Sequence, residues 1–284
     1  MAKRADGFLD QIIDYAGTFP PAALAASEAV ESYFALMDTD DHWIIENLAW
    51  RVADLATLAD LLGNRNVGIA AIGRTGAEWA DWQAAREYDA KDMSVFLGMS
   101  QNSMIRTYEC PAPPLSHFSA GIASLKSYRD ETDVFFEVSW DRDVTDELAM
   151  MAESEWLSAK FRCGGAAIPS PTQLATVLKE CIDLELPFKL TAGLHEPVAH
   201  EGQHGFLNVF AAIGMRYLED SSISEMASIL ADENPSSFSI TGAFAYRGRE
   251  FSEDDLEDLR SFFTTFGSCS VAEPLAGLDR LAGK

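Results

Sequence analysis

The sequence predicts an α/β protein in which eight parallel strands and their helices close one (β/α)8 barrel. Short apolar runs bounded by turn residues alternate with segments of helical periodicity along the chain. Eight such runs fit within 284 residues, which is close to the length that this barrel needs. No G-x-G-x-x-G motif follows the first run, which weakens the alternative of an open dinucleotide-binding sheet. We therefore expect a single barrel domain over residues 1–284.

The expected strands are short apolar and aromatic runs, whereas the expected helices repeat apolar residues every three or four positions. The strands are expected at residues 43–49, 67–72, 104–110, 134–140, 159–163, 188–194, 238–244 and 266–271. The helices between them are expected at residues 55–62, 77–88, 116–128, 145–155, 171–184, 205–218 and 253–263. Residues 93–99 also fit a further strand.

The N-terminal region falls outside this regular alternation. Residues 14–21 read as a loop that ends in a double proline, and a helix is expected over residues 22–36. We expect residues 1–36 to form a segment that covers one end of the barrel.

Charge and hydropathy exclude several classes of partner. The formal net charge is −24 with only 21 basic residues, so nucleic acid and anionic membranes are not expected to bind. The mean hydropathy is −0.04, and no run approaches the roughly 20 apolar residues that span a bilayer. Asp10 and Asp14 come before any apolar core of a signal peptide, so a cytoplasmic protein is expected.

The cysteines do not indicate a metal cluster or a disulfide framework. They are widely spaced and form no C-x-x-C pair, so we expect free thiols. The four are Cys110, Cys163, Cys181 and Cys269.

Two neighbouring expected strands carry the strongest signal for a functional site. Lys160 and Arg162 share one face of the first strand, and Lys189 and Thr191 share one face of the second, because successive side chains of a strand alternate. Buried strands rarely carry cations without partners. Glu137 on the preceding strand would lie beside them at the C-terminal end of the barrel, where such barrels place their chemistry. The pattern predicts an anion-binding, catalytic pocket.

Lysine chemistry gives these residues their expected roles. A lysine beside a second cation has a lowered pKa and can form an imine, so Lys189 is the expected nucleophile and Lys160 the neighbour that lowers its pKa. Arg162 is expected to hold an anion. The alternative is a structural ion pair between Glu137 and Lys160 with Lys189 reaching out of the barrel, and Thr191 also fits an ordinary strand hydroxyl.

Three histidines open a second hypothesis. His200 and His204 complete a literal H-E-x-x-H, the motif in which a helix places both histidines on one zinc ion. Pro197 and Gly202 weaken that helix, so a looser metal site that also uses His195 is the better form of this hypothesis. Alternatively, His195 and His200 line the pocket as donors or acid/base groups while His204 caps the next helix.

Other polar residues are weaker candidates for contacts with a substrate. Cys269 is either a nucleophile or a buried thiol. The remaining candidates are Arg106, Glu109, Glu46, Ser268, Glu273 and Asn208.

A set of motifs resembles a bacterial family of proteins without an assigned activity. The motifs span nearly the whole chain: Asp14-Tyr15-Ala16-Gly17, Phe19-Pro20-Pro21-Ala22, Lys160-x-Arg162-x-Gly164-Gly165, Pro187-Phe188-Lys189-x-Thr191-Ala192-Gly193-Leu194-His195, His204-Gly205-Phe206-Leu207-Asn208 and Phe266-Gly267-Ser268-Cys269-Ser270. The resemblance implies a shared site. The resemblance also implies that relatives carry a second histidine where this chain has Glu196 and a longer gap before the segment matching His204-Gly205-Phe206, so that the H-E-x-x-H here would arise from a shortened loop. The position of Lys189 also resembles that of the lysine in class I aldolases and related Schiff-base lyases.

Three functional hypotheses follow from the sequence. The first is a lyase or aldolase-like enzyme for a small carbonyl compound bearing a carboxylate or phosphate, in which Lys189 reacts, Lys160 and Arg162 hold the anion, and Glu137 or His195 moves protons. The second is a metal-dependent hydrolase or isomerase using the three histidines. The third is a non-catalytic barrel that binds an anionic metabolite. No cofactor is favoured beyond the divalent metal of the second, and all three are compatible with a homo-oligomer.

Overall fold

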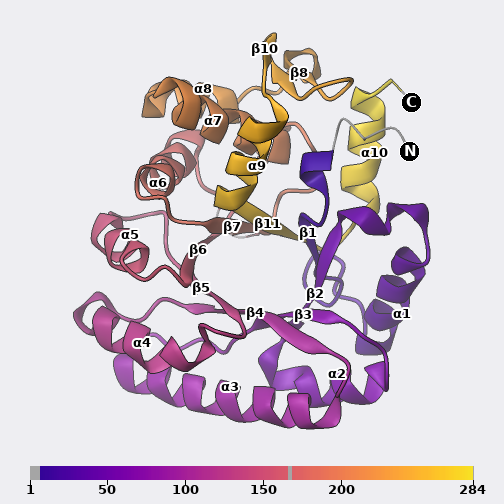
Figure 1. The fold of residues 1–284 in the computed structure, drawn as a ribbon, viewed down its shortest axis with the longest axis vertical. Helices are drawn as coiled ribbons and strands as arrows, with labels where there is room; N and C mark the ends of the chain where they lie inside the picture. The colour runs from indigo at the N-terminus through magenta and orange to yellow at the C-terminus, as the bar shows by residue number, and fades with distance from the viewer. Residues whose placement is uncertain (1–6, 166–167, 284) are drawn as a thin grey trace.

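The computed structural model describes residues 7–165 and 168–283, and in it eight parallel strands close a barrel (Figure 1). The order around the barrel is β1-β11-β7-β6-β5-β4-β3-β2. The fold class predicted from the sequence is therefore confirmed. The barrel strands are β1 (Ile13–Tyr15), β2 (Ile45–Arg51), β3 (Gly68–Ile72), β4 (Met104–Pro111), β5 (Asp133–Glu137), β6 (Leu157–Arg162), β7 (Phe188–Thr191) and β11 (Phe263–Ser268).

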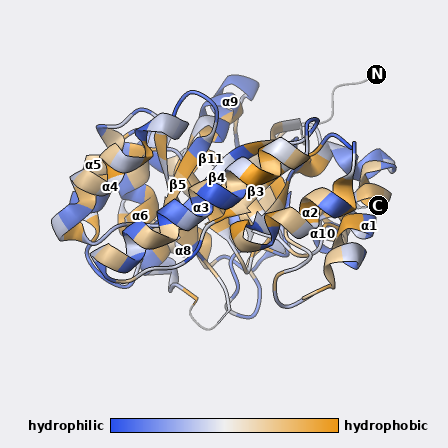
Figure 2. Ribbon diagram, turned by 90° about the horizontal axis from the view of Figure 1, so that it is seen from below, coloured by the Kyte–Doolittle hydropathy of each residue, from blue (hydrophilic) through white to orange (hydrophobic). Residues whose placement is uncertain are grey.

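Helices surround the barrel, as Figure 1 shows. Several begin with a serine whose hydroxyl accepts a hydrogen bond from the third backbone N–H of the helix, as Ser170, Ser222 and Ser252 do. Figure 2 shows hydrophilic residues along α3 and α9, on the outside of the barrel. The helices are α1 (Ala26–Met37), α2 (Leu55–Leu62), α3 (Trp79–Met99), α4 (Phe118–Leu125), α5 (Thr145–Ala152), α6 (Pro171–Asp183), α7 (Phe206–Glu219), α8 (Ile223–Leu230), α9 (Glu253–Phe262) and α10 (Ala272–Leu281).

One predicted barrel strand is wrong. Residues 238–244 supply only β8 (Phe238–Ser239), which pairs antiparallel with β9 (Ala245–Tyr246) in a small sheet outside the barrel that also contains β10 (Arg249–Glu250). This segment is apolar because Phe238, Ile240 and Phe244 are buried in the core, not because it joins the barrel. An apolar run reports burial and does not by itself report strand pairing.

The missing barrel strand is β1, in the region that the sequence assigned to a covering segment. Its three residues pair in parallel with β11 on one side and β2 on the other. The expectation that residues 1–36 only cap the barrel is thus wrong for β1, while residues 1–6 lie outside the described ranges. Residues 93–99, considered as a further strand, form the end of α3.

Polar and apolar side chains divide between the two faces of the barrel strands. Apolar residues such as Phe136, Phe161 and Leu190 are fully buried in the core. Their strand neighbours Lys160 and Lys189 point to the opposite face, into the barrel interior. None of the helices within residues 7–165 and 168–283 combines the length and the apolar composition of a membrane-spanning segment.

Candidate active site

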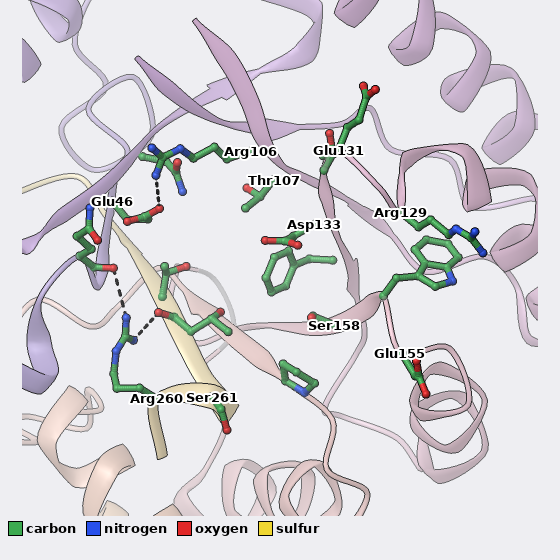
Figure 3. Close-up of a pocket in the computed structure, with 18 of the residues that line it drawn as sticks. Glu46, Arg106, Thr107, Arg129, Glu131, Asp133, Glu155, Ser158, Arg260 and Ser261 are labelled. Carbon is green, nitrogen blue, oxygen red and sulfur yellow. Dashed lines mark hydrogen bonds and ion pairs between the residues drawn. The ribbon is translucent and has the colours of Figure 1, made fainter. Parts of the chain in front are cut away.

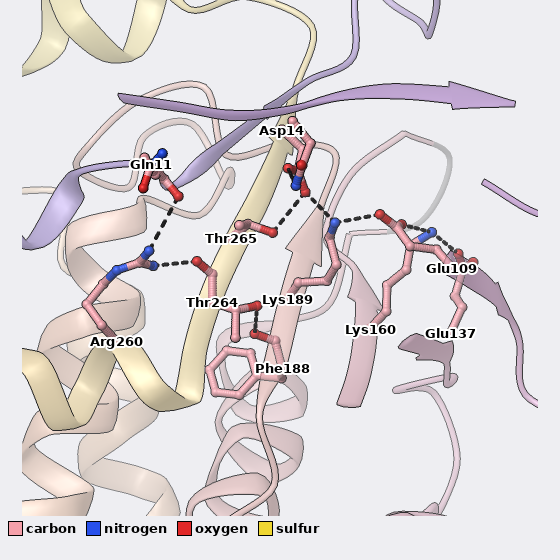
Figure 4. A network of polar contacts seen from close by, with 11 residues as sticks. Gln11, Asp14, Glu109, Glu137, Lys160, Phe188, Lys189, Arg260, Thr264 and Thr265 are labelled. Carbon is pink, nitrogen blue, oxygen red and sulfur yellow. Dashed lines mark hydrogen bonds and ion pairs between the residues drawn. The ribbon is translucent and has the colours of Figure 1, made fainter. Parts of the chain in front are cut away.

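A continuous chain of ion pairs crosses the barrel interior. The Lys189 amine lies 2.5 Å from Asp14 Oδ2 and 2.5 Å from Glu109 Oε1. The other oxygen of Glu109 lies 2.9 Å from the Lys160 amine, which lies 2.9 Å from Glu137 Oε2. Figure 4 shows this order from Asp14 to Glu137, with carboxylates and amines alternating.

The strand register brings these side chains together. Glu137, Lys160 and Lys189 are Cα partners across β5, β6 and β7, so their side chains lie side by side on the same face. Glu109 reaches the lysines from β4 and Asp14 reaches Lys189 from β1. The structure therefore places Glu137, Lys160 and Lys189 side by side, as the strand pattern predicts.

Two neutral side chains form hydrogen bonds with Asp14, which lies at one end of the ion-pair chain. Asn47 Nδ2 donates to Asp14 Oδ1 at 2.9 Å, and the Thr265 hydroxyl donates to Asp14 Oδ2 at 2.9 Å. Both oxygens of this buried carboxylate are therefore satisfied, which fixes its position opposite Lys189.

Solvent accessibility differs among the residues of this ion-pair chain. Lys189 is 1 % exposed, and its partners Asp14 and Glu109 are equally buried. Lys160 is also buried, but the side chain of its second partner, Glu137, is 31 % exposed. Solvent therefore reaches the ion-pair chain most readily at Glu137, which is the last residue of β5.

Burial and ion pairing act in opposite directions on these groups. Burial alone would raise the pKa of Glu109, but the ammonium groups of Lys160 and Lys189 lower that pKa to about 2. Burial would lower the pKa of each lysine, yet the carboxylates beside it raise the pKa of both Lys160 and Lys189. Both amines are thus protonated at neutral pH in this state.

This electrostatic arrangement corrects one expectation from the sequence. Lys160 does not lower the pKa of Lys189, because Glu109 lies between the two amines and neutralises their repulsion. Nor is Lys160 free to hold an anion, since it already contacts two carboxylates. With two lysines against three carboxylates, the interior chain favours cations over anions.

Cationic side chains with more freedom lie at the C-terminal ends of the strands. Arg162 is exposed at the end of β6, on the same face as Lys160, and is the Cα partner of Thr191. No carboxylate among the described residues forms an ion pair with Arg162. Arg51 ends β2, also exposed, and its guanidinium lies 4.4 Å from the centre of the Phe19 ring. The sequence analysis did not single out Arg51.

The loops that follow β6 and β7 approach each other closely through glycine. A Cβ added to Gly164 would lie 2.7 Å from Gly193 N, and one added to Gly193 would overlap Cys163 O. Gly193 also has a φ of +82°, in the region that favours glycine. The glycines thus let two backbones meet directly beside Arg162 and Thr191.

The H-E-x-x-H segment does not form a zinc-binding helix. His200 and Gln203 form an isolated β-bridge, and α7 begins only at Phe206. His204 is buried with Nε2 2.8 Å from Pro169 O, and burial lowers its pKa. The sequence-based zincin hypothesis is therefore wrong in its helical geometry.

The looser three-histidine site is not assembled either. His195 follows β7, and its Nδ1 lies 2.9 Å from Glu273 Oε2 on α10. Across residues 7–165 and 168–283, no three histidine, cysteine, aspartate or glutamate side chains are grouped so that they could hold a metal ion. His195 therefore contacts Glu273, whereas His204 contacts the Pro169 carbonyl.

Two predicted substrate contacts, Asn208 and Ser268, make hydrogen bonds within the fold. Asn208 is fully buried on α7, where its Oδ1 accepts from Ala199 N and its Nδ2 donates to Ile229 O and Asp232 O. The amide oxygen and nitrogen of this buried side chain thus join three segments of the fold. The Ser268 hydroxyl donates to Ser270 O at 2.6 Å and shapes the turn after β11.

Arg106 lies at the opposite end of the barrel. Its Nη1 is 2.7 Å from Glu46 Oε1, and both residues line a cavity of about 750 Å³ at the N-terminal ends of the strands (Figure 3). Arg106 therefore does not join Lys160 and Lys189.

Asp14 and Glu109 are the central residues that the sequence analysis underrated. Both are carboxylates inside short apolar segments, Ile12-Ile13-Asp14-Tyr15 and residues 104–110. A buried carboxylate needs a cation as much as a buried lysine needs an anion. Matching the lysines of two strands with the carboxylates of two others would have pointed to them.

Comparison with known proteins supports the fold and leaves the activity open. No family model and no curated protein matches the sequence. Among solved structures, the chain is similar to deoxyribose phosphate aldolase from Aeropyrum pernix, described as having a unique tetrameric structure. The TM-score is 0.51 at 13 % identity, covering 99 % of this chain and 94 % of that chain. The fold and the interior ion pairs thus define a (β/α)8-barrel protein with a buried lysine–carboxylate site.

Proposed function

We propose that this chain is an aldolase-like lyase acting on a small carbonyl compound that carries a carboxylate or phosphate. The observation that carries the proposal is the pair of buried amines, Lys160 and Lys189, bridged by Glu109 in the barrel interior. A lysine amine forms an imine with a carbonyl carbon, and the imine then accepts the electron pair of the breaking C–C bond. The similarity in fold to a solved deoxyribose phosphate aldolase supports the proposal.

We assign the imine-forming role to Lys160. The sequence analysis expected this role for Lys189. A substrate must reach the amine, and the Lys189 amine is enclosed by two carboxylates that are themselves buried. Lys160 borders Glu137, whose side chain is partly exposed. Lys189 then acts as the fixed cation on the far side of Glu109.

Glu137 supplies the proton transfer that imine formation requires. The Lys160 ammonium must lose a proton before its nitrogen can attack, and Glu137 Oε2 lies 2.9 Å away. Once Glu137 is neutral, Lys160 retains only Glu109, whose single charge is shared with Lys189. A shared carboxylate stabilises the ammonium form of Lys160 less than two carboxylates do, which favours the neutral amine. The protonated Glu137 can return its proton to the departing water.

Arg162 is the group that we propose for the anionic end of the substrate. It ends β6 on the face that carries Lys160, two residues away, and has no ion pair within the described ranges. Its planar guanidinium suits a carboxylate or phosphate. Thr191, its Cα partner on β7, can add a hydroxyl donor.

Borohydride trapping tests the proposal. The protein is incubated with a panel of keto acids and sugar phosphates, reduced with borohydride, and mapped by peptide mass spectrometry. We expect one covalent adduct per chain on Lys160. Lys160→Arg should lose the adduct and the exposed-site control Lys91→Arg should keep it.

The outcomes separate the hypotheses. An adduct that persists unchanged in Lys160→Arg contradicts our assignment, and one that maps to Lys189 restores the order of roles first expected. Phosphate or carboxylate affinity without any adduct or turnover across the panel supports the non-catalytic barrel.

We also propose a homo-oligomer. The similar aldolase is described as tetrameric, and α3 of this chain exposes the apolar side chains of Tyr88, Val95 and Met99. Light scattering on the purified chain measures the assembly directly, and a strictly monomeric mass would contradict the proposal.

A further inference from the structure

The cavity at the N-terminal ends of the barrel strands is separate from the site proposed above. Its volume is about 750 Å³, and its lining includes residues near the start of β2, β4, β5, β6 and β11. Neither Lys160 nor Lys189 lines it. Barrels of this class place their chemistry at the other end, so a cavity here calls for its own explanation.

Two residues that line the cavity each hold a buried polar atom without a hydrogen-bond partner among the described residues. These atoms are Asn47 Oδ1 and Thr107 Oγ1. Both residues line the cavity, and they are only 1 % and 7 % exposed. A buried polar atom without a partner costs about 1–3 kcal/mol, so each is a position where a bound molecule would be stabilised. Asn47 Oδ1 can only accept a hydrogen bond, which calls for a donor on the ligand.

The charge of the cavity wall is negative. Six carboxylates and three arginines line it. Two of the arginines are neutralised within the wall, by the ion pairs Arg106–Glu46 at 2.7 Å and Arg129–Asp130 at 3.2 Å. The wall therefore retains an excess of carboxylate charge, which disfavours an anionic ligand.

The third arginine is committed to the backbone. Arg260 donates to the carbonyls of Phe263 and Thr264, and more weakly to those of Asp10 and Gln11, as Figures 3 and 4 show in part. Burial lowers the pKa of Arg260 to about 10. Its donors fasten the start of β11 to the segment before β1, so it offers little to an anion.

Asp133 is placed to meet a cation at the cavity wall. It is the Cα partner of Thr107 across β4 and β5, and Figure 3 shows its carboxylate beside the Thr107 side chain. No lysine, arginine or histidine in the described ranges forms an ion pair with it. Asp133 and Thr107 therefore place oxygens side by side on neighbouring strands, and Asn47 on β2 lines the same cavity.

We propose that this cavity binds a small organic cation with primary ammonium groups, of the diamine class. An ammonium group brings three donors and a positive charge, matching the unpartnered oxygens and the Asp133 carboxylate. A bare metal ion fits less well, because the described residues group no three histidine, cysteine, aspartate or glutamate side chains for one.

Isothermal titration of the full chain with 1,4-diaminobutane at 150 mM salt tests the proposal. We expect saturable binding of one diamine per chain. Asp133→Asn should weaken it at least tenfold. Thr107→Val, which removes the unpartnered hydroxyl and keeps the shape, should fold normally and also weaken binding.

The control separates a built site from attraction to an acidic chain. Asp60→Asn removes one exposed carboxylate of α2, away from the cavity, and should leave binding unchanged. Equal loss in Asp60→Asn and Asp133→Asn overturns the proposal, as does absence of saturable binding. Tighter binding of inorganic phosphate, magnesium or ribitol than of the diamine also overturns it. These titrations measure binding and not catalysis, so their outcome does not depend on the proposed lyase activity.

Discussion

Glu109 lies with Oε1 2.5 Å from the Lys189 amine, at the centre of a closed barrel where both residues are 1 % exposed. Its second oxygen contacts Lys160. One carboxylate thus holds two ammonium groups that would otherwise repel each other in a medium of low dielectric. The stability of the barrel and the protonation of its amines therefore depend on the same side chain.

Acid should weaken the fold through Glu109. Its pKa is about 2 in the folded chain against an ordinary 4.5, so its contribution to stability is complete above pH 4.5 and is lost as the pH falls toward 2. The contribution is about 3 kcal/mol, since each pKa unit corresponds to about 1.4 kcal/mol. Urea unfolding between pH 2 and 7 measures it as the difference between the wild type and Glu109→Gln. A parallel pair of pH curves would contradict this coupling.

Lys189 and Asp14 should show a strong energetic coupling. Lys189→Met leaves Asp14 and Glu109 buried with one cation fewer, so the free energy of unfolding should fall by about 3–5 kcal/mol. Asp14→Asn should be destabilising as well, whereas the double variant should lose less than the sum of the two. Urea unfolding of all four proteins gives the coupling energy. Additive losses would mean that the pair contributes no specific stabilisation.

The sequence revealed the lysine side of this network more readily than the carboxylate side. Lys160 and Lys189 lie in β6 and β7, whose apolar flanks are long enough to predict strands and so to fix which face each side chain takes. Asp14 lies in β1, which has only three residues and leaves no periodic pattern. Its pairing with β11, some 250 residues away, depends on barrel closure and is not encoded locally.

The histidines show a second limit of sequence reasoning. H-E-x-x-H predicts chemistry only when a helix carries it, and here the backbone turns at residues 200–203 because Glu201 and Gly202 adopt positive φ. Pro197 and Gly202 correctly signalled a poor helix. His204 contacts Pro169 O and His195 contacts Glu273. These partners come from distant segments, so the spacing of the histidines does not predict them.

His204 should add a separate pH dependence near neutrality. Burial lowers its pKa below the ordinary 6.5, so the folded chain favours neutral imidazole. Its contribution to stability is complete above pH 6.5 and is lost as the pH falls from there through the lowered pKa. His204→Gln should therefore show a smaller loss of unfolding free energy between pH 7 and 5 than the wild type. NMR titration of the imidazole checks the direction of the shift, and a raised pKa would refute the argument.

Arg162 should govern substrate affinity without governing stability. It is exposed and has no ion pair in the described chain, so Arg162→Gln should leave the unfolding midpoint unchanged. If the proposed activity holds, KM for an anionic substrate should rise roughly tenfold or more, since a charge-assisted hydrogen bond contributes about 1.5–3 kcal/mol. Lys91→Gln, an exposed control on α3, should change neither value. Equal KM values in both variants would place the anion elsewhere.

The contact between the β6 and β7 loops should be the most sensitive backbone position at the C-terminal mouth. Gly193 and Gly165 both have a φ of +82°, so replacement by alanine strains each backbone by about 1 kcal/mol. Only Gly193 has a neighbour in the way: its added Cβ would overlap Cys163 O, whereas the Cβ at Gly165 meets nothing within 4 Å.

Gly193→Ala should therefore lower the free energy of unfolding by about 1–3 kcal/mol more than Gly165→Ala. The excess isolates the clash, because the two variants share the same backbone strain. Separation of the loops should also move Thr191 relative to Arg162, so ligand affinity should fall in Gly193→Ala and hold in Gly165→Ala. Equal stabilities in urea unfolding would show that the loops yield freely and that their close approach does not position the mouth.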